Sequence, residues 1–370
     1  MKNYIYYVNP MSYNNLSVYD YSLISNIKNY QVEYFCSSKY DYEEKNLNTN
    51  KIYHYSSKKG ILKILSYLKS QFLLYRKIKL NQDKIRAIHF QWLKIPHLDF
   101  LLLKMISKKS EIILTAHNIL PHGSGNKYRS IYKKIYHKVD RLIVHTNETK
   151  NDLVDLFEVP TNKIHVVPHG ILDVLDQTEN NRVLESAKMF NDLYGLNNKT
   201  VFSSLGSISS YKGIDIIINT WKKKELINRD DVVLLIAGSG KNEKLLELKG
   251  VNNAIVINRF LSSHEFLACV RMSDFILMPY TKISQSGILL TAIGEKKRVI
   301  VSNVGGLTEP FEIGEIGYVL DKVNSDSLGR AILRAIDEKD NYPDESVWTR
   351  LFKYYDWSNI GRKTELVYSV

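Results

Sequence analysis

Short apolar runs alternate along this chain with longer segments in which apolar residues recur every three or four positions. Eleven of the runs have the length and the β-branched or aromatic content of strands. They are residues 3–8, 31–36, 86–91, 111–116, 141–146, 164–167, 200–205, 232–237, 254–257, 274–279 and 298–302. This twofold alternation of strand and helix predicts two doubly wound parallel sheets, each with helices on both faces and with ligands beyond the carboxyl ends of the strands.

A polar stretch near residues 173–199 separates the two sets of strands. With 370 residues and 44% hydrophobic content, the chain exceeds the usual size of one domain. We therefore expect domains at residues 1–172 and 173–345, followed by a closing segment at 346–370. That segment contains a helix pattern capped at Ser358, with Ile360, Leu366 and Val367 available for packing.

The positive charge is concentrated in the first half. Residues 1–170 hold 26 Lys and Arg against 13 Asp and Glu, a net charge of +13, whereas the whole chain carries +12. The asymmetry indicates an anionic partner for the N-terminal half, which can be nucleic acid, an acidic membrane or a phosphorylated lipid. Cys36 and Cys269 lie in separate apolar runs, so we expect them in the core rather than in a disulfide or a metal cluster.

Three loops after strands of the second half are candidates for binding an anion. The first contains Gly206 and leads to Lys212, and the second contains Gly238. In the third, Ser286 and Gly287 stand where a strand passes into a helix, and free N–H groups there can hold a phosphate. Alternatively, the lysine is a solvated surface charge, the glycines form an ordinary turn, and Ser286 is an N-cap.

These motifs, in this order, resemble the retaining GT-B glycosyltransferases of family 4. The resemblance rests on "VVPHGI", "YKGID", "AGSG", "MPY" followed by "SQSG", "RVIVSNVGGLTE" and the closing helix, and it covers most of the chain. It implies a nucleotide-diphosphate sugar, UDP- or GDP-linked, as donor substrate. It further implies transfer with retention, no metal and no cofactor, and a final helix that crosses back onto the N-terminal domain.

The resemblance also implies roles for single residues. Lys212 contacts the donor diphosphate, which the helix start at Ser286 and Gly287 also holds, and His117 in "LTAHNILPHG" contacts the donor sugar; His117 and Lys212 are therefore the expected catalytic residues. The remaining expected donor contacts are Gly206, Ser207, Ser209, Gly238, Arg259, Phe260, Gln285 and Glu309. Acceptor or cleft positions are expected at His89, Asn118 and His122, and His169 is expected to be structural.

Three features depart from the family pattern. The pair of glutamates common at the third loop is absent, with Gln285 or Ser286 near the first place and Thr291 at the second. Ser207 and Ser209 occupy the loop in which an arginine usually joins the lysine. The glycine-rich loop after the first strand is replaced by "NPMSYNN", where Asn14 or Asn15 supplies backbone freedom.

Two basic segments favour a membrane interface. Residues 57–79 carry Ile61, Leu65, Leu68 and Phe72 on one helical face among lysines, and residues 127–141 carry Tyr128, Tyr132 and Tyr136 among six basic residues. For each helix the alternative is that the apolar face packs on the sheet.

The function expected is transfer of a hexose-type sugar to a lipid-linked glycan during capsule, O-antigen or exopolysaccharide synthesis. The N-terminus has no secretory h-region, so we expect a cytoplasmic protein, peripheral on the inner face of the membrane. The alternatives are a catalytically silent GT-B-like glycan-binding or partner protein and a GT-B nucleotide-sugar epimerase. Nucleic-acid binding ranks last, because the aromatic residues form helical stripes rather than a strand platform.

Overall fold

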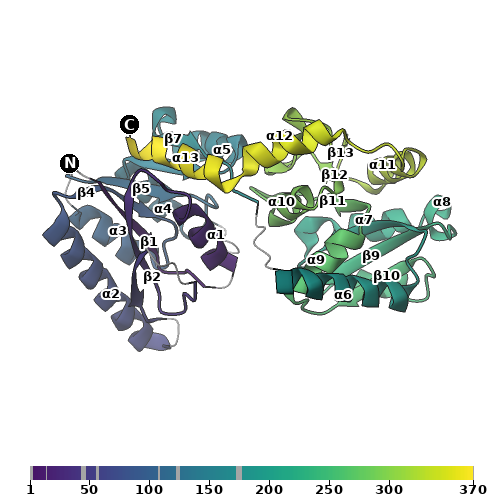
Figure 1. Ribbon diagram of the computed structural model, residues 1–370, viewed down its shortest axis with the longest axis horizontal. Helices are drawn as coiled ribbons and strands as arrows, with labels where there is room; N and C mark the ends of the chain where they lie inside the picture. Colours follow the sequence, from purple (N-terminus) through teal and green to yellow (C-terminus); the bar gives the residue numbers. More distant parts are fainter. Residues whose placement is uncertain are drawn as a thin grey trace. The chain divides into compact units, whose positions relative to one another are not determined.

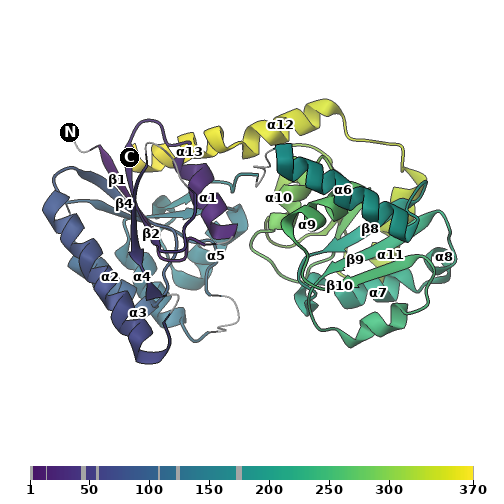
Figure 2. The same cartoon turned by 60° about the horizontal axis from the view of Figure 1, so that its bottom comes forward.

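The computed structural model of the chain consists of two α/β units (Figures 1 and 2). It describes residues 3–13, 15–42, 47–55, 58–106, 109–121, 126–171 and 177–369. Unit 1 comprises Met1–Gly170 and Tyr355–Val370, and unit 2 comprises Ile171–Tyr354. The chain therefore leaves unit 1 once and returns to it at its end.

Unit 1 contains a parallel sheet of seven strands in the order β3-β2-β1-β4-β5-β6-β7. The strands are β1 (Tyr4–Asn9), β2 (Gln31–Ser37), β3 (Asn48–Tyr53), β4 (Ile85–Phe90), β5 (Glu111–Thr115), β6 (Arg141–Val144) and β7 (Ile164–Val166). The strand order reverses between β1 and β4, so the carboxyl ends of these strands border the crevice where doubly wound sheets bind ligands.

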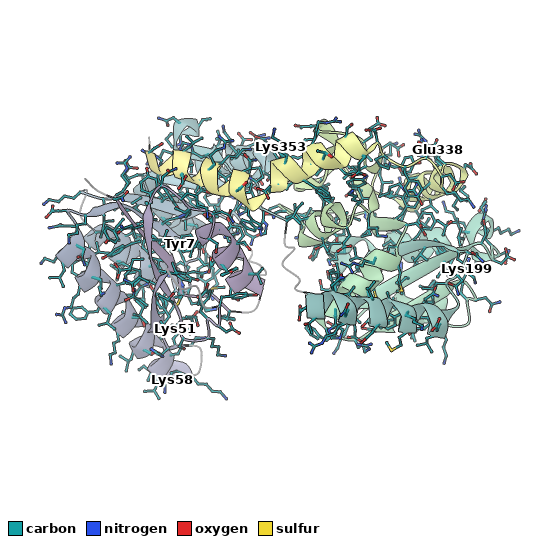
Figure 3. The ribbon with its side chains drawn as sticks, in the orientation of Figure 1. Tyr7, Lys51, Lys58, Lys199, Glu338 and Lys353 are labelled. Carbon is teal, nitrogen blue, oxygen red and sulfur yellow. The ribbon has the colours of Figure 1, made fainter. Side chains whose placement is uncertain are left out.

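The helices of unit 1 cover both faces of this sheet. They are α1 (Asn15–Ile24), α2 (Gly60–Asn81), α3 (Pro96–Met105), α4 (Arg129–Lys138), α5 (Asn147–Phe157) and α13 (Trp357–Ser369), with the 3-10 turn η2 (Thr161–Lys163). Side chains of α2 to α5 pack with Tyr6 and Val8 in one core, and those of α1 and α13 pack with Ile5 and Tyr7 in the other. Successive residues of β1 thus face opposite cores, as the pleat requires, and Figure 3 shows Tyr7 within this layer.

Unit 2 contains a parallel sheet of six strands in the order β10-β9-β8-β11-β12-β13. The strands are β8 (Thr200–Leu205), β9 (Val232–Gly238), β10 (Ala254–Asn258), β11 (Phe275–Met278), β12 (Arg298–Ser302) and β13 (Gly317–Leu320). The helices are α6 (Gln177–Tyr194), α7 (Ile214–Trp221), α8 (Lys224–Ile227), α9 (Ser263–Met272), α10 (Gly287–Gly294), α11 (Ser325–Asp337) and α12 (Glu345–Tyr355), with the 3-10 turns η3 (Ser210–Lys212), η4 (Glu243–Leu248), η5 (Gly305–Leu307) and η6 (Glu309–Glu312). One face carries α7 and α11, which pack in one core with the strands, and α6 lies beside α9 (Figure 2).

All eleven predicted strands are present, and the two-sheet architecture is confirmed. The sequence analysis missed β3 and β13, which lie at the edges of the two sheets. Their side chains are largely exposed or half-buried. An edge strand faces water along one side and therefore needs no apolar run.

The closing helix differs from its prediction in two details. It begins at Trp357 rather than after a cap at Ser358, because Asp356 Oδ1 accepts a hydrogen bond of 2.9 Å from Ser358 N. Ile360 and Val367 are buried as predicted, but Leu366 is 55% exposed. The helix is also held to unit 1 by Glu365, whose Oε1 accepts from the backbone N of Lys28 and of Asn29 at 2.6 Å.

The tyrosines of α4 do not form an interfacial stripe. Tyr136 is fully buried, Tyr132 is 8% exposed, and the Tyr136 hydroxyl donates to Ile119 O at 2.7 Å. The apolar face of α4 therefore packs on the sheet, which is the alternative that the sequence left open. Among the described helices, none has the length and apolarity to cross a bilayer.

Candidate functional site

The carboxyl end of β8 in unit 2 is built around a close approach of two glycine loops. Gly206 follows β8 with a φ of 85°, and its N donates to Ala237 O at 2.9 Å. Gly238, the last residue of β9, has a φ of 150°, and a Cβ there would lie 1.8 Å from Gly206 O. Both positions favour glycine, because other residues rarely adopt such backbone conformations. At Gly238 a methyl group would also collide with the neighbouring loop.

Lys212 lies at the end of η3 with its ammonium group under this loop. The residue is only 6% exposed, and Nζ donates to Leu205 O at 3.1 Å. Leu205 O is the one hydrogen-bond acceptor found for Nζ among the described residues, whereas an ammonium has three N–H donors. Burial lowers the pKa of Lys212 to about 8, so the cation lacks part of its solvation and favours an incoming anion.

The first turn of α10 lies at the same place. Ser286 is its N-cap, and Ser286 Oγ accepts from Leu289 N at 3.4 Å. In the described part of the chain, no acceptor is found for the N–H groups of Gly287 and Ile288, and the space beside Gly287 is open. Ser286 is thus a cap, as one interpretation of the sequence held, and the cap leaves two donors of the helix N-terminus available.

Gly206 connects Lys212 with α10. A Cβ at Gly206 would lie 3.0 Å from Lys212 Nζ and 3.1 Å from Ile288 Cδ1. A buried ammonium and the positive end of a helix dipole therefore face the same glycine turn. We call this arrangement the candidate anion site; its chemistry suits a phosphate or diphosphate.

The loops beside the candidate anion site carry the other predicted donor contacts. Another close approach between loops occurs at Gly305, where a Cβ would lie 1.9 Å from Ile283 O. Ser207 is exposed, and Ser209, Gln285 and Glu309 are half-buried. Ser209 Oγ is shielded from water without a hydrogen-bond partner among the described residues.

Arg259 and Phe260 follow β10 at the same sheet edge. Arg259 is paired with Glu265 through an N–O distance of 2.7 Å, and this pairing together with the cap at Ser262 lowers the pKa of Glu265 to about 2. Phe260 is 83% exposed. An exposed aromatic ring next to a fixed backbone can stack on a planar base.

In unit 1, His117 belongs to a cluster of aromatic side chains at the carboxyl ends of the strands. Its ring stacks on Trp92 with centroids 4.6 Å apart, and Tyr19 contacts it edge-on at 5.1 Å. His117 Nδ1 lies 3.0 Å from His145 Nε2, and His117 Nε2 lies 2.9 Å from the Gln91 side-chain amide. We call His117, His145 and His169 the histidine cluster.

Hydrogen bonding fixes the tautomers of the histidine cluster. His145 Nδ1 is 2.9 Å from Val167 O, and since a carbonyl only accepts, Nδ1 carries the proton. A neutral His145 then accepts at Nε2, so His117 donates from Nδ1 and keeps a lone pair on Nε2. The structure places Gln91 Oε1 2.9 Å from His117 Nε2 and Gln91 Nε2 3.1 Å from His89 Nε2. A neutral His145 requires the reverse orientation of this amide, which has the same shape and brings the –NH₂ group to the lone pair of His117.

Burial supports the neutral forms. It holds the pKa of His117 well below its usual range, with the neighbouring histidines adding to the effect, and it lowers the pKa of His145 to about 4. The nitrogen that His117 can offer to a ligand is therefore an acceptor. A sugar hydroxyl can donate to it by replacing the Gln91 amide.

The structure places the predicted acceptor residues differently. His89 does not line an open site: it is fully buried, with Nδ1 2.7 Å from the Tyr368 hydroxyl and Nε2 2.8 Å from Thr115 Oγ1. The prediction failed because the side chain points into the core, where α13 covers it. Asn118 is half-buried beside His117, and His122 lies outside the described residues. His169 has its Nδ1 bonded to Gly170 O at 2.7 Å.

The sequence analysis missed three members of this site. Gln91 and Trp92 are the first two residues after β4, and His145 directly follows β6. Their position beyond strand ends was a usable signal, since parallel strands bring all their carboxyl ends to one edge. The sequence does not show which of these side chains bond to one another.

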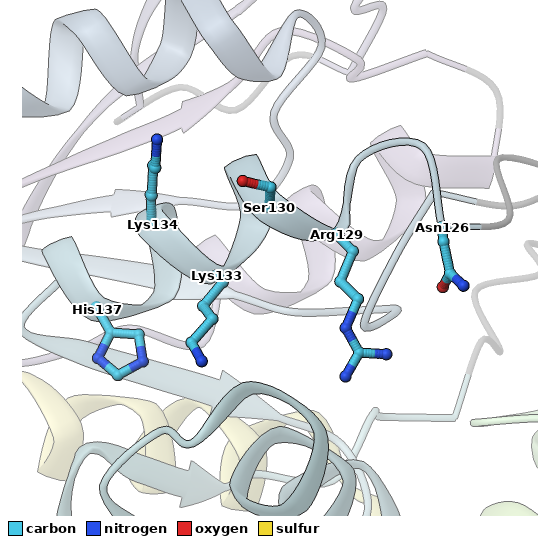
Figure 4. Close-up of a pocket in the computed structure, with 6 residues that line it drawn as sticks. All are labelled: Asn126, Arg129, Ser130, Lys133, Lys134 and His137. Carbon is cyan, nitrogen blue, oxygen red and sulfur yellow. The ribbon is translucent and has the colours of Figure 1, made fainter.

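A groove along α4 is lined by basic side chains (Figure 4). Arg129 donates to Leu156 O at 2.7 Å, His137 Nε2 lies 3.0 Å from Phe157 O, and Lys133 pairs with Glu158 at 2.8 Å. These three side chains therefore contact the carboxyl end of α5, where cations stabilise the helix dipole. Through these contacts α4 is held against the end of α5.

Comparison with known proteins identifies the two halves separately. Residues 189–346 match the family model described as glycosyl transferases group 1, and residues 27–172 match glycosyltransferase family 4. An uncharacterized glycosyltransferase of Methanocaldococcus jannaschii is 24% identical over 237 residues, 62% of this chain and 60% of that protein. The chain spans about half to two thirds of the length of such curated relatives.

Solved structures share the fold over nearly the whole chain. Sucrose-phosphate synthase from Thermosynechococcus elongatus has a TM-score of 0.72 at 14% identity, covering 99% of this chain and 98% of that one. HepE from Anabaena, in complex with UDP and glucose, has a TM-score of 0.69 at 13% identity and full coverage of both chains. At these identities the likeness shows the GT-B fold.

Proposed function

We propose that this chain, whose two halves match the models of glycosyl transferases group 1 and glycosyltransferase family 4 and which has the GT-B fold, is a glycosyltransferase that transfers a hexose-type sugar from a UDP- or GDP-linked donor with retention at the sugar carbon. The observation that carries the proposal is the candidate anion site. A buried, incompletely bonded ammonium and two free backbone donors meet at one sheet edge in unit 2. The structures of HepE contain UDP or UDP-glucose, which supports a uridine nucleotide as the first donor to test.

The chemistry of transfer suits this arrangement. As the bond between the sugar and the diphosphate breaks, negative charge accumulates on the leaving nucleotide. Lys212 and the first turn of α10 would stabilise that charge where it develops, which lowers the barrier more than binding the ground state alone. We propose that no metal is required, because the fixed cation and helix dipole supply this stabilisation.

The histidine cluster would hold the sugar in the proposed reaction. His117 Nε2 offers a lone pair, and Trp92 provides a flat apolar surface beside it. A sugar presents hydroxyl donors and apolar C–H faces, so it matches both features. In this proposal His117 Nε2 accepts a hydrogen bond from a hydroxyl of the donor sugar, and Lys212 binds the diphosphate.

The proposed acceptor is a lipid-linked saccharide used in assembling a bacterial surface polysaccharide such as capsule or O-antigen. The net charge of +13 on residues 1–170 supports an anionic, pyrophosphate-bearing acceptor at the inner face of the membrane. The protein would accordingly be cytoplasmic and peripheral.

The alternative of a silent transferase-like protein rests on the third loop. Gln285 and Thr291 stand where the family commonly has glutamates, and the Thr291 hydroxyl donates to Gly287 O at 3.0 Å within the helix. Both the transferase and the silent protein can bind the nucleotide, but only the transferase converts the donor sugar to product.

Thermal unfolding with UDP, GDP and ADP added separately tests the donor. A ligand that binds the folded state raises its stability by RT ln(1 + [L]/Kd), so one nucleotide is expected to raise the melting temperature. Proton NMR of the UDP-sugar or GDP-sugar reaction then follows the anomeric signal of the product. Binding without turnover would support the silent protein, and no shift with any nucleotide would contradict the proposed function.

A further inference from the structure

Helix α2 is apolar on two opposite faces. Its inner face is buried against the sheet through Tyr67, Leu74 and Ile78, together with Ser70 and Gln71. Its outer face exposes eight large apolar side chains: Ile61, Leu62, Ile64, Leu65, Leu68, Phe72, Leu73 and Leu80. The packing of α2 on unit 1 is therefore complete without the outer face.

The exposed apolar side chains are concentrated on this helix and its neighbour. Of twenty exposed large apolar side chains among the described residues, eight lie on α2, and Leu101 and Met105 add two more on α3. Helix α3 packs beside α2 (Figure 1). Single exposed apolar residues are ordinary, whereas a gathered set marks an interaction surface. We call these ten side chains the α2–α3 surface.

The central stripe of this surface has a defined geometry. Ile61, Leu65, Leu68 and Phe72 are spaced by four, three and four residues, so they form one line along the helix. The line is about 16 Å long at a rise of roughly 1.5 Å per residue. Ile61 is 72% exposed and Phe72 is 59% exposed, so the stripe stands clear of the protein.

The charge around the stripe has one sign. Residues 58–82 contain no Asp or Glu and carry seven basic side chains: Lys58, Lys59, Lys63, Lys69, Arg76, Lys77 and Lys79. Figure 3 labels Lys58 at the tip of unit 1 next to the start of α2. The guanidinium of Arg76 lies 6.0 Å from the centre of the Phe72 ring, so a cation borders the apolar line itself.

This combination selects among the possible partners. Lys77 is paired with Glu33 of β2 at 3.3 Å. A second copy of α2 would bring the remaining positive charges against an equal set, and residues 58–82 supply no carboxylate to pair with them. An anionic lipid surface supplies negative charge for the lysines and an apolar layer for the stripe, which is how interfacial helices bind.

We propose that the α2–α3 surface docks on an anionic bilayer, with α2 parallel to the membrane and Ile61, Leu65, Leu68 and Phe72 inserted below the headgroups. The inference extends the proposed function, since it states which face of unit 1 meets the membrane that holds the acceptor. Its test needs neither nucleotide nor acceptor, so it can fail while the transferase proposal stands.

The experiment is vesicle flotation of the purified full chain. Vesicles of phosphatidylcholine with phosphatidylglycerol are compared with vesicles of phosphatidylcholine alone. The test variant is Leu65→Ser with Leu68→Ser, and the matched control is Leu193→Ser with Leu246→Ser, two exposed leucines of unit 2. Circular dichroism and thermal unfolding without ligand verify that each variant is folded.

We expect the native chain to float with the anionic vesicles and the control to behave like it. The Leu65→Ser and Leu68→Ser pair should lower the partition coefficient at least about tenfold, because burial of each leucine side chain contributes strongly to insertion. Lys69→Gln and Arg76→Gln should each lower it about fivefold, and added salt should weaken binding of the native chain.

Three outcomes would overturn the proposal. One is equal flotation of the test pair and the control. Another is no flotation of the native chain with anionic vesicles, which would leave an acidic protein as the partner. The third is a lipid-free dimer, seen by light scattering, that the Leu65→Ser and Leu68→Ser pair converts to a monomer, because a second copy would then occupy the surface.

Discussion

Replacing Lys212 by methionine should stabilise the protein and abolish its response to nucleotide. Lys212 is 6% exposed and its Nζ has one identified acceptor, Leu205 O. Methionine keeps a long apolar stem but carries no charge. The substitution therefore separates the cost of burying a cation from the benefit of holding an anion.

The magnitude follows from the pKa of Lys212. Burial lowers that pKa from 10.5 to about 8. At roughly 1.4 kcal/mol per pKa unit, the protonated amine destabilises the empty protein by about 3 kcal/mol near pH 7. Losing the hydrogen bond to Leu205 O removes about 1 kcal/mol, which leaves a net gain of about 2 kcal/mol for Lys212→Met.

The pH dependence has a defined sign. The folded protein binds fewer protons at Lys212 than the unfolded chain does between pH 8 and 10.5, so this residue makes the free energy of unfolding rise as the pH rises through that window. Lys212→Met should lose this rise. The gain over the native protein should therefore be largest below pH 8.

Differential scanning calorimetry with and without UDP measures both effects. Without ligand, the melting temperature of unit 2 should rise by roughly 4–8 °C. With UDP, affinity should fall about tenfold to a hundredfold, because a charge-assisted bond to phosphate is lost. Lys249→Met, at an exposed lysine, is the matched control and should change stability by less than about 0.5 kcal/mol.

The reasoning is refuted if Lys212→Met is less stable than the native protein without ligand, or if it keeps the full UDP-induced shift. The first result would mean that Lys212 is a structural cation with unrecognised partners. The second would place the anion elsewhere.

Three further predictions concern a glycine substitution, the tautomer of His117 and the pH dependence of stability. Gly238→Ala should destabilise unit 2 by more than about 4 kcal/mol in denaturant titration, since its Cβ would meet Gly206 O at 1.8 Å; Gly250→Ala, with a φ of 82° but open space, should cost only about 1–2 kcal/mol. In nitrogen-15 NMR of the imidazoles, His117 should be the Nδ1–H tautomer. In His145→Phe the other tautomer of His117 should appear, because the acceptor for Nδ1–H is lost; if His145 only fills space, the tautomer of His117 should not change. Stability should fall on acidification from about pH 6.5 to 4, because the buried histidines bind protons in that range only when the chain is unfolded; the pKa of His145 in the folded protein is about 4. Asp20 and Asp99, both with a pKa of about 7, act in the opposite direction and make the fall in stability less steep. A flat or rising melting temperature over that range would contradict the assignment.

Much of the fold could be predicted from the sequence because most of its strands are buried on both faces. Such strands must be continuous apolar runs, and the eleven that were predicted are all present. The edge strands β3 and β13 could not be found in this way, because partial exposure removes the apolar signal. Leu366 and the tyrosines of α4 show the same limit, since helical spacing identifies a face but not the side that is buried.

The sequence alone determined the candidate anion site in outline. Gly206 directly follows β8, Lys212 lies further along the same loop, and Ser286 and Gly287 end the loop after β11. Because parallel strands bring their carboxyl ends to one edge, the sequence placed these loops together. Local composition also identified Ile61, Leu65, Leu68 and Phe72 as one face of a helix.

Only the tertiary structure decided how those positions are used. It buried Lys212 enough to lower its pKa, turned His89 into the core under α13, and paired His117 with His145. It also showed that α2 packs on its sheet through the other face, which leaves its apolar stripe in water. Burial and pairing depend on contacts between residues far apart in the chain, and the spacing of residues along one segment carries no record of them.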